Sequence, residues 1–102
     1  MTHGDFTLSA NGTIVLACDD AVRAIDALTK DGMRLERWEG IVVTATGARM
    51  KSLEHGGSFA LSADGARAAQ SAVEGIRRAQ ATWDRRPEFE RATLHVALTF
   101  GR

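Results

Sequence analysis

The chain of 102 residues has one cysteine, one proline and no tyrosine. Because Cys18 is alone, an intrachain disulfide cannot form and a zinc site built from several thiolates is excluded. No apolar run reaches the length of a membrane span, and residues 1–5 lack the basic segment and apolar stretch of a signal peptide. We therefore expect a cytoplasmic protein with no membrane partner.

Net charge is also absent, since 13 basic and 13 acidic residues cancel. This balance removes the whole-chain electrostatic argument for binding nucleic acid, so such binding would need a local basic patch. Eleven of the 13 basic residues are Arg, and with the abundant Ala this composition is typical of a small bacterial or phage protein. The rigid guanidinium fork of Arg suits interfaces.

Length and composition indicate a single domain over residues 1–102. Hydrophobic residues make up 44% and charged residues 25% of the chain, as in ordinary globular proteins. A chain of this size supports one modest core and is too short for two. No linker rich in Pro, Ser or like charges divides it.

The first third of the chain predicts a hairpin and a helix. Two β-like runs, Phe6–Ala10 and Thr13–Cys18, flank Asn11-Gly12, a dipeptide that favours a two-residue hairpin turn. Asp19 or Asp20 then caps a helix over 21–30, which Asp31-Gly32 ends.

The middle of the chain predicts a meander of short strands. The run 41–46 is β-branched and apolar, which favours a strand buried on both faces or nearly so. Residues 49–53 and 58–61 predict two more strands, separated by the polar sequence Glu54-His55-Gly56-Gly57, which we interpret as a turn.

The last third predicts the longest helix and the clearest strand. Small and apolar residues recur at helical spacing over 63–83, behind Ser62 as a candidate N-cap. Gly75 inside this helix indicates that a neighbouring backbone comes near. In 92–100, Leu94, Val96, Leu98 and Phe100 alternate with smaller or polar residues, so one face is core and the other is wet or interfacial.

Together these elements predict an α+β fold with an antiparallel sheet and two helices packed on one face. The order approximates βαββαβ, ferredoxin-like, plus an extra N-terminal hairpin strand. An antiparallel sandwich with a different strand order is the alternative, because the meander supplies at least one strand too many. A match between FTLSANG at 6–12 and FALSADG at 59–65 is compatible with a duplicated βαβ unit, or with chance in an Ala- and Gly-rich chain.

Residues that could carry catalysis form no recognisable catalytic, zinc or dinucleotide pattern, so we assign no catalytic residue, metal site or cofactor. Cys18 lies near a helix start, but Asp19 and Asp20 oppose thiolate formation beside it. A small enzyme centred on Glu54 and His55, with Cys18 or His95, is the weakest of three hypotheses; it requires one pocket to join these groups.

Two charged surfaces give the other hypotheses. Asp19, Asp20, Asp26 and Asp31 outnumber the cations of the first helix, and with Arg37 and Trp38 they form our candidate protein-binding set. Trp38 fits an interface or the core equally well. Arg77, Arg78, Arg85, Arg86 and Arg91 form a basic corner that could bind nucleic acid, although favourable charge at a helix C-terminus explains it as well.

The leading hypothesis is therefore a non-catalytic protein-binding module, such as an immunity, inhibitor or anti-defence protein. Its acidic helix could cover a basic cleft on a partner, for example a toxin or a nuclease. The nucleic-acid-binding or regulatory module is the alternative. A homodimer through the outward face of the last strand, or through an exposed sheet edge, is compatible with either.

Overall fold

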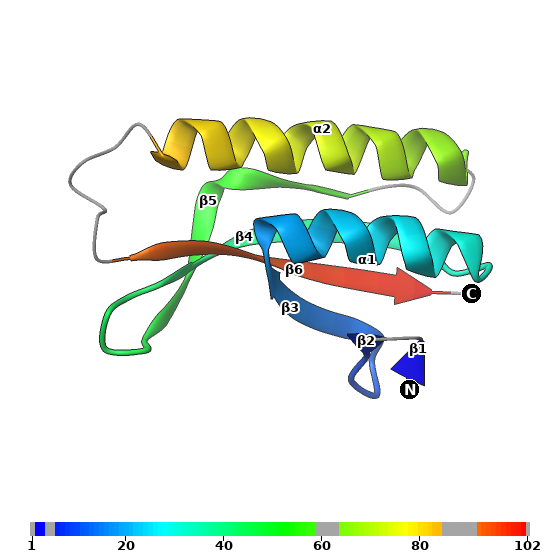
Figure 1. Cartoon of the computed structure of the whole chain (residues 1–102), viewed down its shortest axis with the longest axis horizontal. Coiled ribbons are helices and arrows are strands. Elements are labelled where there is room, and N and C mark those ends of the chain that lie inside the picture. The colour runs from blue at the N-terminus through cyan, green and yellow to red at the C-terminus, as the bar shows by residue number, and fades with distance from the viewer. Residues whose placement is uncertain (1, 4–5, 59–63, 85–91, 102) are drawn as a thin grey trace.

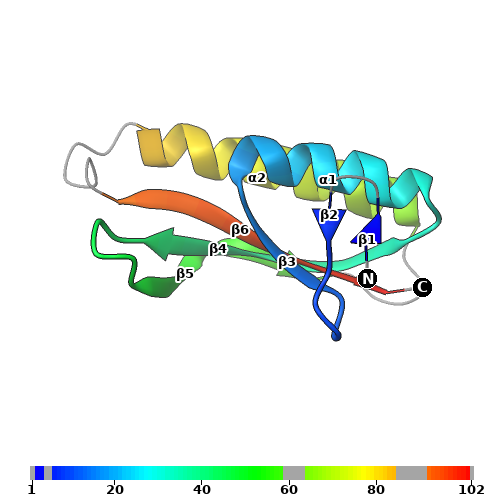
Figure 2. The ribbon, with the colours of Figure 1, turned by 60° about the horizontal axis from the view of Figure 1, so that its bottom comes forward.

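The computed structural model describes residues 2–3, 6–58, 64–84 and 92–101, without the side chains of 2–3 and 52–55. It confirms the α+β class, because an antiparallel four-stranded sheet carries two helices on one face. The helices lie in front of the sheet in Figure 1 and above it in Figure 2. No described helix or strand lies over the opposite face of the sheet, which we call the open face.

The sheet contains β3 (Thr13–Ala17), β6 (Thr93–Gly101), β4 (Arg34–Val43) and β5 (Arg49–Ser58), paired in that order. Helix α1 (Cys18–Lys30) joins β3 to β4, and α2 (Gly65–Asp84) lies between β5 and β6 in the sequence. In each βαβ unit, one strand of the other unit lies between the two strands: β6 lies between β3 and β4, and β4 lies between β5 and β6. The helices run side by side in opposite directions (Figure 1).

The strand order differs from the ferredoxin-like order that the sequence suggested. In the ferredoxin-like arrangement the first strand of each βαβ unit lies at the centre of the sheet. Here the second strands, β4 and β6, are central, and β5 pairs on the outside of β4. Right-handed crossovers permit both arrangements, so the element order alone could not decide between them.

The predicted N-terminal hairpin is wrong, although its turn exists. Strand β2 (Phe6–Thr7) pairs with β1 (Thr2–His3) in a separate two-stranded sheet, while β3 pairs with β6. The turn before β3 is closed by hydrogen bonds from the Gly12 N–H to the Ser9 carbonyl and from the Ser9 N–H to the Thr13 carbonyl, each 2.9 Å. Gly12 has a φ of +79°, and a Cβ there would lie 2.3 Å from the Phe100 carbonyl oxygen, so only glycine fits.

Helix α1 begins three residues earlier than predicted, at Cys18, with Ala17 as an N-cap that gives no side-chain hydrogen bond. Asp19 and Asp20 therefore lie in the first turn, where the helix dipole favours their charge. The predicted stop is correct. Gly32, with a φ of +87°, donates to the Thr29 carbonyl, and the Met33 N–H donates to the Leu28 carbonyl, which is the pattern of a Schellman motif.

Helix α2 begins at Gly65, and Asp64 is its N-cap. The Asp64 carboxylate accepts hydrogen bonds from the N–H groups of Ala66, at 2.9 Å, and Arg67, at 3.3 Å. The predicted cap, Ser62, lies outside the described residues. The buried face consists mostly of small residues, as expected: Ala68, Ala72, Ile76 and Ala79. Within the described part of the chain, neither helix has the length and hydrophobicity needed to cross a membrane.

Strands β4 and β5 correct two predictions about the meander. The run 41–43 is half-buried rather than buried on both faces, and no described element covers the open face, to which Ile41 and Val43 project. The predicted turn at 54–57 is strand instead: β5 continues through Gly56 and Gly57. The register changes there, since Glu39 pairs with Gly56 whereas Gly40 pairs with Ser52. The extra residues 53–55 bulge from the ladder, which bends the strand without ending it.

The core lies between the sheet and the helices and includes the four alternating residues of β6, as the sequence predicted. At its β4–β5 side, the indole of Trp38 is 6% exposed. Two glycines make room for this ring. A Cβ at Gly75 of α2 would lie 2.6 Å from Trp38 Cζ2, and one at Gly57 of β5 would lie 2.9 Å from Trp38 Nε1. Gly75 therefore marks a close approach, but of a side chain rather than the predicted backbone.

We predict that Gly75→Ala destabilises the fold. Ala is normally better than Gly inside a helix by about 1 kcal/mol, but here its methyl group would overlap the indole and cost about 1–3 kcal/mol. Urea unfolding followed by circular dichroism measures the difference. Gly65→Ala is the matched control, because nothing lies within 4 Å of its Cβ position. A stabilised Gly75→Ala variant would contradict this account of the core.

Candidate partner-binding site

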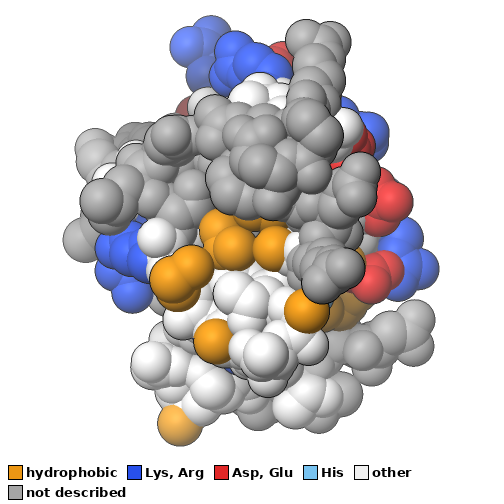
Figure 3. Space-filling model, turned by 90° about the vertical axis from the view of Figure 1, so that its left-hand side faces the viewer, with side chains coloured by type: hydrophobic (Ala, Val, Ile, Leu, Met, Phe, Trp, Pro, Cys, Tyr) orange, Lys and Arg blue, Asp and Glu red, His pale blue; other side chains and the backbone are white. Residues whose placement is uncertain are grey.

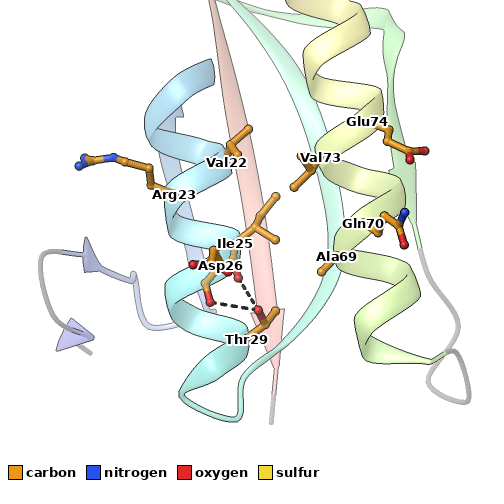
Figure 4. A pocket seen from close by; sticks show the side chains of 9 residues that line it. All are labelled: Val22, Arg23, Ile25, Asp26, Thr29, Ala69, Gln70, Val73 and Glu74. Atoms are coloured by element: carbon orange, nitrogen blue, oxygen red, sulfur yellow. Dashed lines mark hydrogen bonds between the residues drawn. The ribbon is translucent and has the colours of Figure 1, made fainter.

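A groove of about 510 Å³ runs between α1 and α2 on the outer surface of the helical layer. Figure 4 shows that Val22 of α1 and Val73 of α2 point toward each other across it, with Ile25 beneath them and Ala69 on the α2 side. Ile25 is buried, whereas the other three are partly buried and pack on the core. The groove therefore has a well-packed apolar floor. Its volume lies within the range of known ligand-binding pockets.

The rim of the groove is polar and carries more acidic than basic side chains. It is formed by Arg23, Asp26, Thr29, Gln70 and Glu74. Arg23 and Glu74 point away from the floor in Figure 4, and the Thr29 hydroxyl donates back to the Ile25 carbonyl at 2.6 Å. Glu74 has no ion pair among the described residues. An apolar centre with charged margins is the usual anatomy of a protein interface.

The four predicted aspartates lie in or directly after α1, in the helical layer. Two of them form ion pairs with cations of the same helix. Asp20 pairs with Arg23 at 2.8 Å and Asp26 with Lys30 at 3.1 Å. Both are exposed pairs, whose contribution to stability is small. Asp19 and Asp31 are exposed at opposite ends of the helix. Of these four aspartates, only Asp26 lines the groove. The negative charge predicted for this helix is therefore partly neutralised and is not gathered on one surface.

The other two members of the predicted protein-binding set lie apart from this helix. Arg37 projects from the open face, where its guanidinium is 3.9 Å from the Glu39 carboxylate. Trp38 belongs to the core, where the indole is covered by α2 and β5, and this burial favours the core over the interface for this residue.

The predicted basic corner is only partly described. Arg77 and Arg78 are exposed on α2. Arg85, Arg86 and Arg91 lie outside the described residues, so their relation to one another stays a prediction.

A second hollow, of about 490 Å³, lies where β3 and α2 end and α1 and β6 begin. It is lined by Ala17, Cys18, Asp19, Gln80, Trp83, Asp84, Ala92, Thr93, Leu94 and His95. Figure 3 faces this end: hydrophobic side chains gather at its centre, and the Asp and Glu side chains in view lie mostly at the right, next to Lys and Arg side chains. Within the described ranges, no three His, Cys, Asp or Glu side chains are grouped so that they could hold a metal ion.

The Cys18 thiol in this hollow is held in its protonated form. It is buried, and its S–H points to the Leu94 carbonyl at 3.6 Å. Desolvation, followed by the charges of Asp19 and Asp84, raises its pKa from 9.0 to about 11. A reactive cysteine needs the opposite shift. Cys18 and His95 do share this hollow, but the side chains of Glu54 and His55 are outside the described set, so the enzyme hypothesis stays untested.

Sequence reasoning missed the groove itself. Val73 and Ala69 belong to the small and apolar residues that recur at helical spacing over 63–83, and Val22 follows the same spacing with Ile25 and Leu28 in α1. The available signal was the width of the apolar stripe on each helix, because each stripe includes more positions than the buried ones.

Comparison with protein-family models, with curated proteins and with solved structures finds no match for this chain.

The pKa of Cys18 predicts a pH-dependent stability. The folded state keeps the thiol proton to a higher pH than the unfolded chain, so this contribution is fully present below pH 9 and is lost as the pH rises toward 11. The free energy of unfolding should fall by about 2–3 kcal/mol more in the native protein than in Cys18→Ala over this interval. Denaturant unfolding at pH 8.5, 10 and 11 measures it, and parallel pH profiles would show the prediction to be wrong.

Proposed function

We propose that the protein is a non-catalytic protein-binding module that receives an apolar ridge of its partner in the groove between α1 and α2. The partner ridge carries basic residues at its margins, which would lie beside Asp26 and Glu74. An immunity, inhibitor or anti-defence protein acting on a toxin or nuclease is of this kind. The proposal is supported chiefly by the groove itself, whose apolar floor is open to the surrounding water.

Three further observations favour protein over nucleic acid as the ligand at this site. The groove is lined by aliphatic side chains, whereas bases are bound by stacking on aromatic or guanidinium planes. Its rim includes two carboxylates, which repel phosphates. The one cation on its rim, Arg23, is engaged by Asp20. Nucleic-acid binding through the basic corner remains the alternative.

The test uses the whole chain as bait in a lysate of its source organism, followed by titration of the identified partner. Ala69→Arg places a long cationic side chain over the groove floor, and we expect the dissociation constant to rise by about tenfold or more. Ala81→Arg makes the same change at an exposed position of α2 outside the groove, and should leave affinity within about twofold.

Two results would contradict the proposal. One is a partner that binds both Arg variants as tightly as the native protein. The other is salt-sensitive binding to a DNA or RNA probe that Arg77→Ala/Arg78→Ala abolishes, which would favour the nucleic-acid-binding alternative.

A further inference from the structure

The described walls of the interhelical groove offer no free backbone groups. The lining residues fall within 22–29 of α1 and 69–74 of α2. Both segments lie inside their helices, where the N–H and C=O groups are hydrogen-bonded along the helix or, for the last carbonyls of α1, to the residues that follow it. The Thr29 hydroxyl is also engaged, at 2.6 Å from the Ile25 carbonyl and 3.2 Å from the Asp26 carbonyl (Figure 4).

This lining restricts the backbone conformation of an occupant. An extended segment in the groove would set some of its own N–H and C=O groups against aliphatic side chains, where they lose hydrogen bonds to water and gain none. An α-helix has no such loss, because its backbone groups are bonded to one another. The groove therefore favours a helix over an extended segment, as other grooves that receive helices do.

The length of the groove corresponds to about two turns of a helix. Val22 and Thr29 of α1 both line it, and residues with this spacing lie about 10 Å apart along the helix axis. On a helix that lies along the groove, side chains at positions i, i+4 and i+7 cover the same distance on one side. Three apolar side chains at this spacing would therefore contact the whole floor.

The two walls of the groove differ in charge. On the α1 wall, Arg23 is paired with Asp20. Asp26, on the same wall, is paired with Lys30. On the α2 wall, Glu74 is exposed and has no ion pair among the described residues. The charge on the rim that no described neighbour compensates is thus a carboxylate on the α2 side, and it favours a cation there.

We propose that the occupant of the groove is an amphipathic α-helix of the partner protein, with Lys or Arg along the flank that faces α2. The inference rests on the proposed function, because it names the element of the partner that the groove would receive. It also gives the partner a recognisable sequence: apolar residues at i, i+4 and i+7, with basic residues on one side of that stripe.

Two stapled helical peptides test the proposal on the full chain. Each has about 18 residues, enough for a stable helix, and three leucines at the stated spacing. One carries two lysines along one flank, and the other carries two glutamates there. Titration into isotope-labelled protein, followed by NMR, locates the contact. The lysine peptide should shift the amide signals of Val22, Ala69 and Val73 and should bind about fivefold more tightly than the glutamate peptide.

Glu74→Lys should reverse this preference, because it places a cation on the α2 wall, so the glutamate peptide should then bind about fivefold more tightly. Asp84→Lys is the matched control. It makes the same change of charge at another exposed position of α2, roughly 15 Å along the axis and beyond the screening length at about 0.1 M salt. It should keep the native preference. Thermal unfolding first verifies that both variants fold.

Four results would overturn the proposal. The first is the absence of groove shifts at about 1 mM lysine peptide. The second is equally tight binding of an unstapled peptide whose helix is broken by a central proline. The third is an unchanged preference in Glu74→Lys. The fourth is a set of groove shifts that grows with the concentration of the protein alone, which would identify a second copy as the occupant.

The failure of this inference is distinguishable from the failure of the proposed function. If any of these four results is found while Ala69→Arg still weakens the natural partner, the groove binds that partner through another kind of element, and only the helix is wrong. If Ala69→Arg leaves the affinity of the natural partner unchanged, the proposed function is wrong and this inference fails with it.

Discussion

The packing of one indole ring between two glycines fixes α2 against the β4–β5 side of the sheet. Trp38 projects from a central strand, and both Gly75 of α2 and Gly57 of β5 come so close that a methyl group on either would overlap it. A glycine inside a helix costs about 1 kcal/mol relative to Ala. Here that cost is offset by the apolar area of the largest side chain in the core, which contacts helix and strand at once.

The packing site of Trp38 also determines where the candidate surfaces lie. It fixes α2 against β4 and β5, and α2 provides one wall of the interhelical groove. Because both helices pack on the same face, the opposite face carries its aliphatic side chains without a described cover. The chain thus presents two separate surfaces, a groove on the helical layer and the open face of the sheet.

Local patterns predicted the elements that depend on local chemistry. The alternation in β6 and the small-residue stripe of α2 are read directly from side-chain periodicity, and Gly32 ends α1 as expected. Strand pairing could not be predicted in this way, because Thr13–Ala17 pairs with β6 near the other end of the chain rather than with the adjacent Phe6–Thr7. The sequence predicts a turn at Gly56 and Gly57, since nothing in it shows that one of them faces Trp38. The groove is built from two helices and the second hollow from parts of β3, α1, α2 and β6, so residues that line them together are far apart in the sequence.

A double-mutant cycle on Trp38 and Gly75 tests the central claim most directly. In a Trp38→Phe background the smaller ring leaves the space that a Cβ at position 75 needs. We therefore predict that Gly75→Ala, which destabilises the native protein, becomes neutral or stabilising there, with a coupling energy of about 1–3 kcal/mol. If Gly75→Ala changes the free energy of unfolding equally in both backgrounds, the indole does not set the position of α2 and the account is wrong.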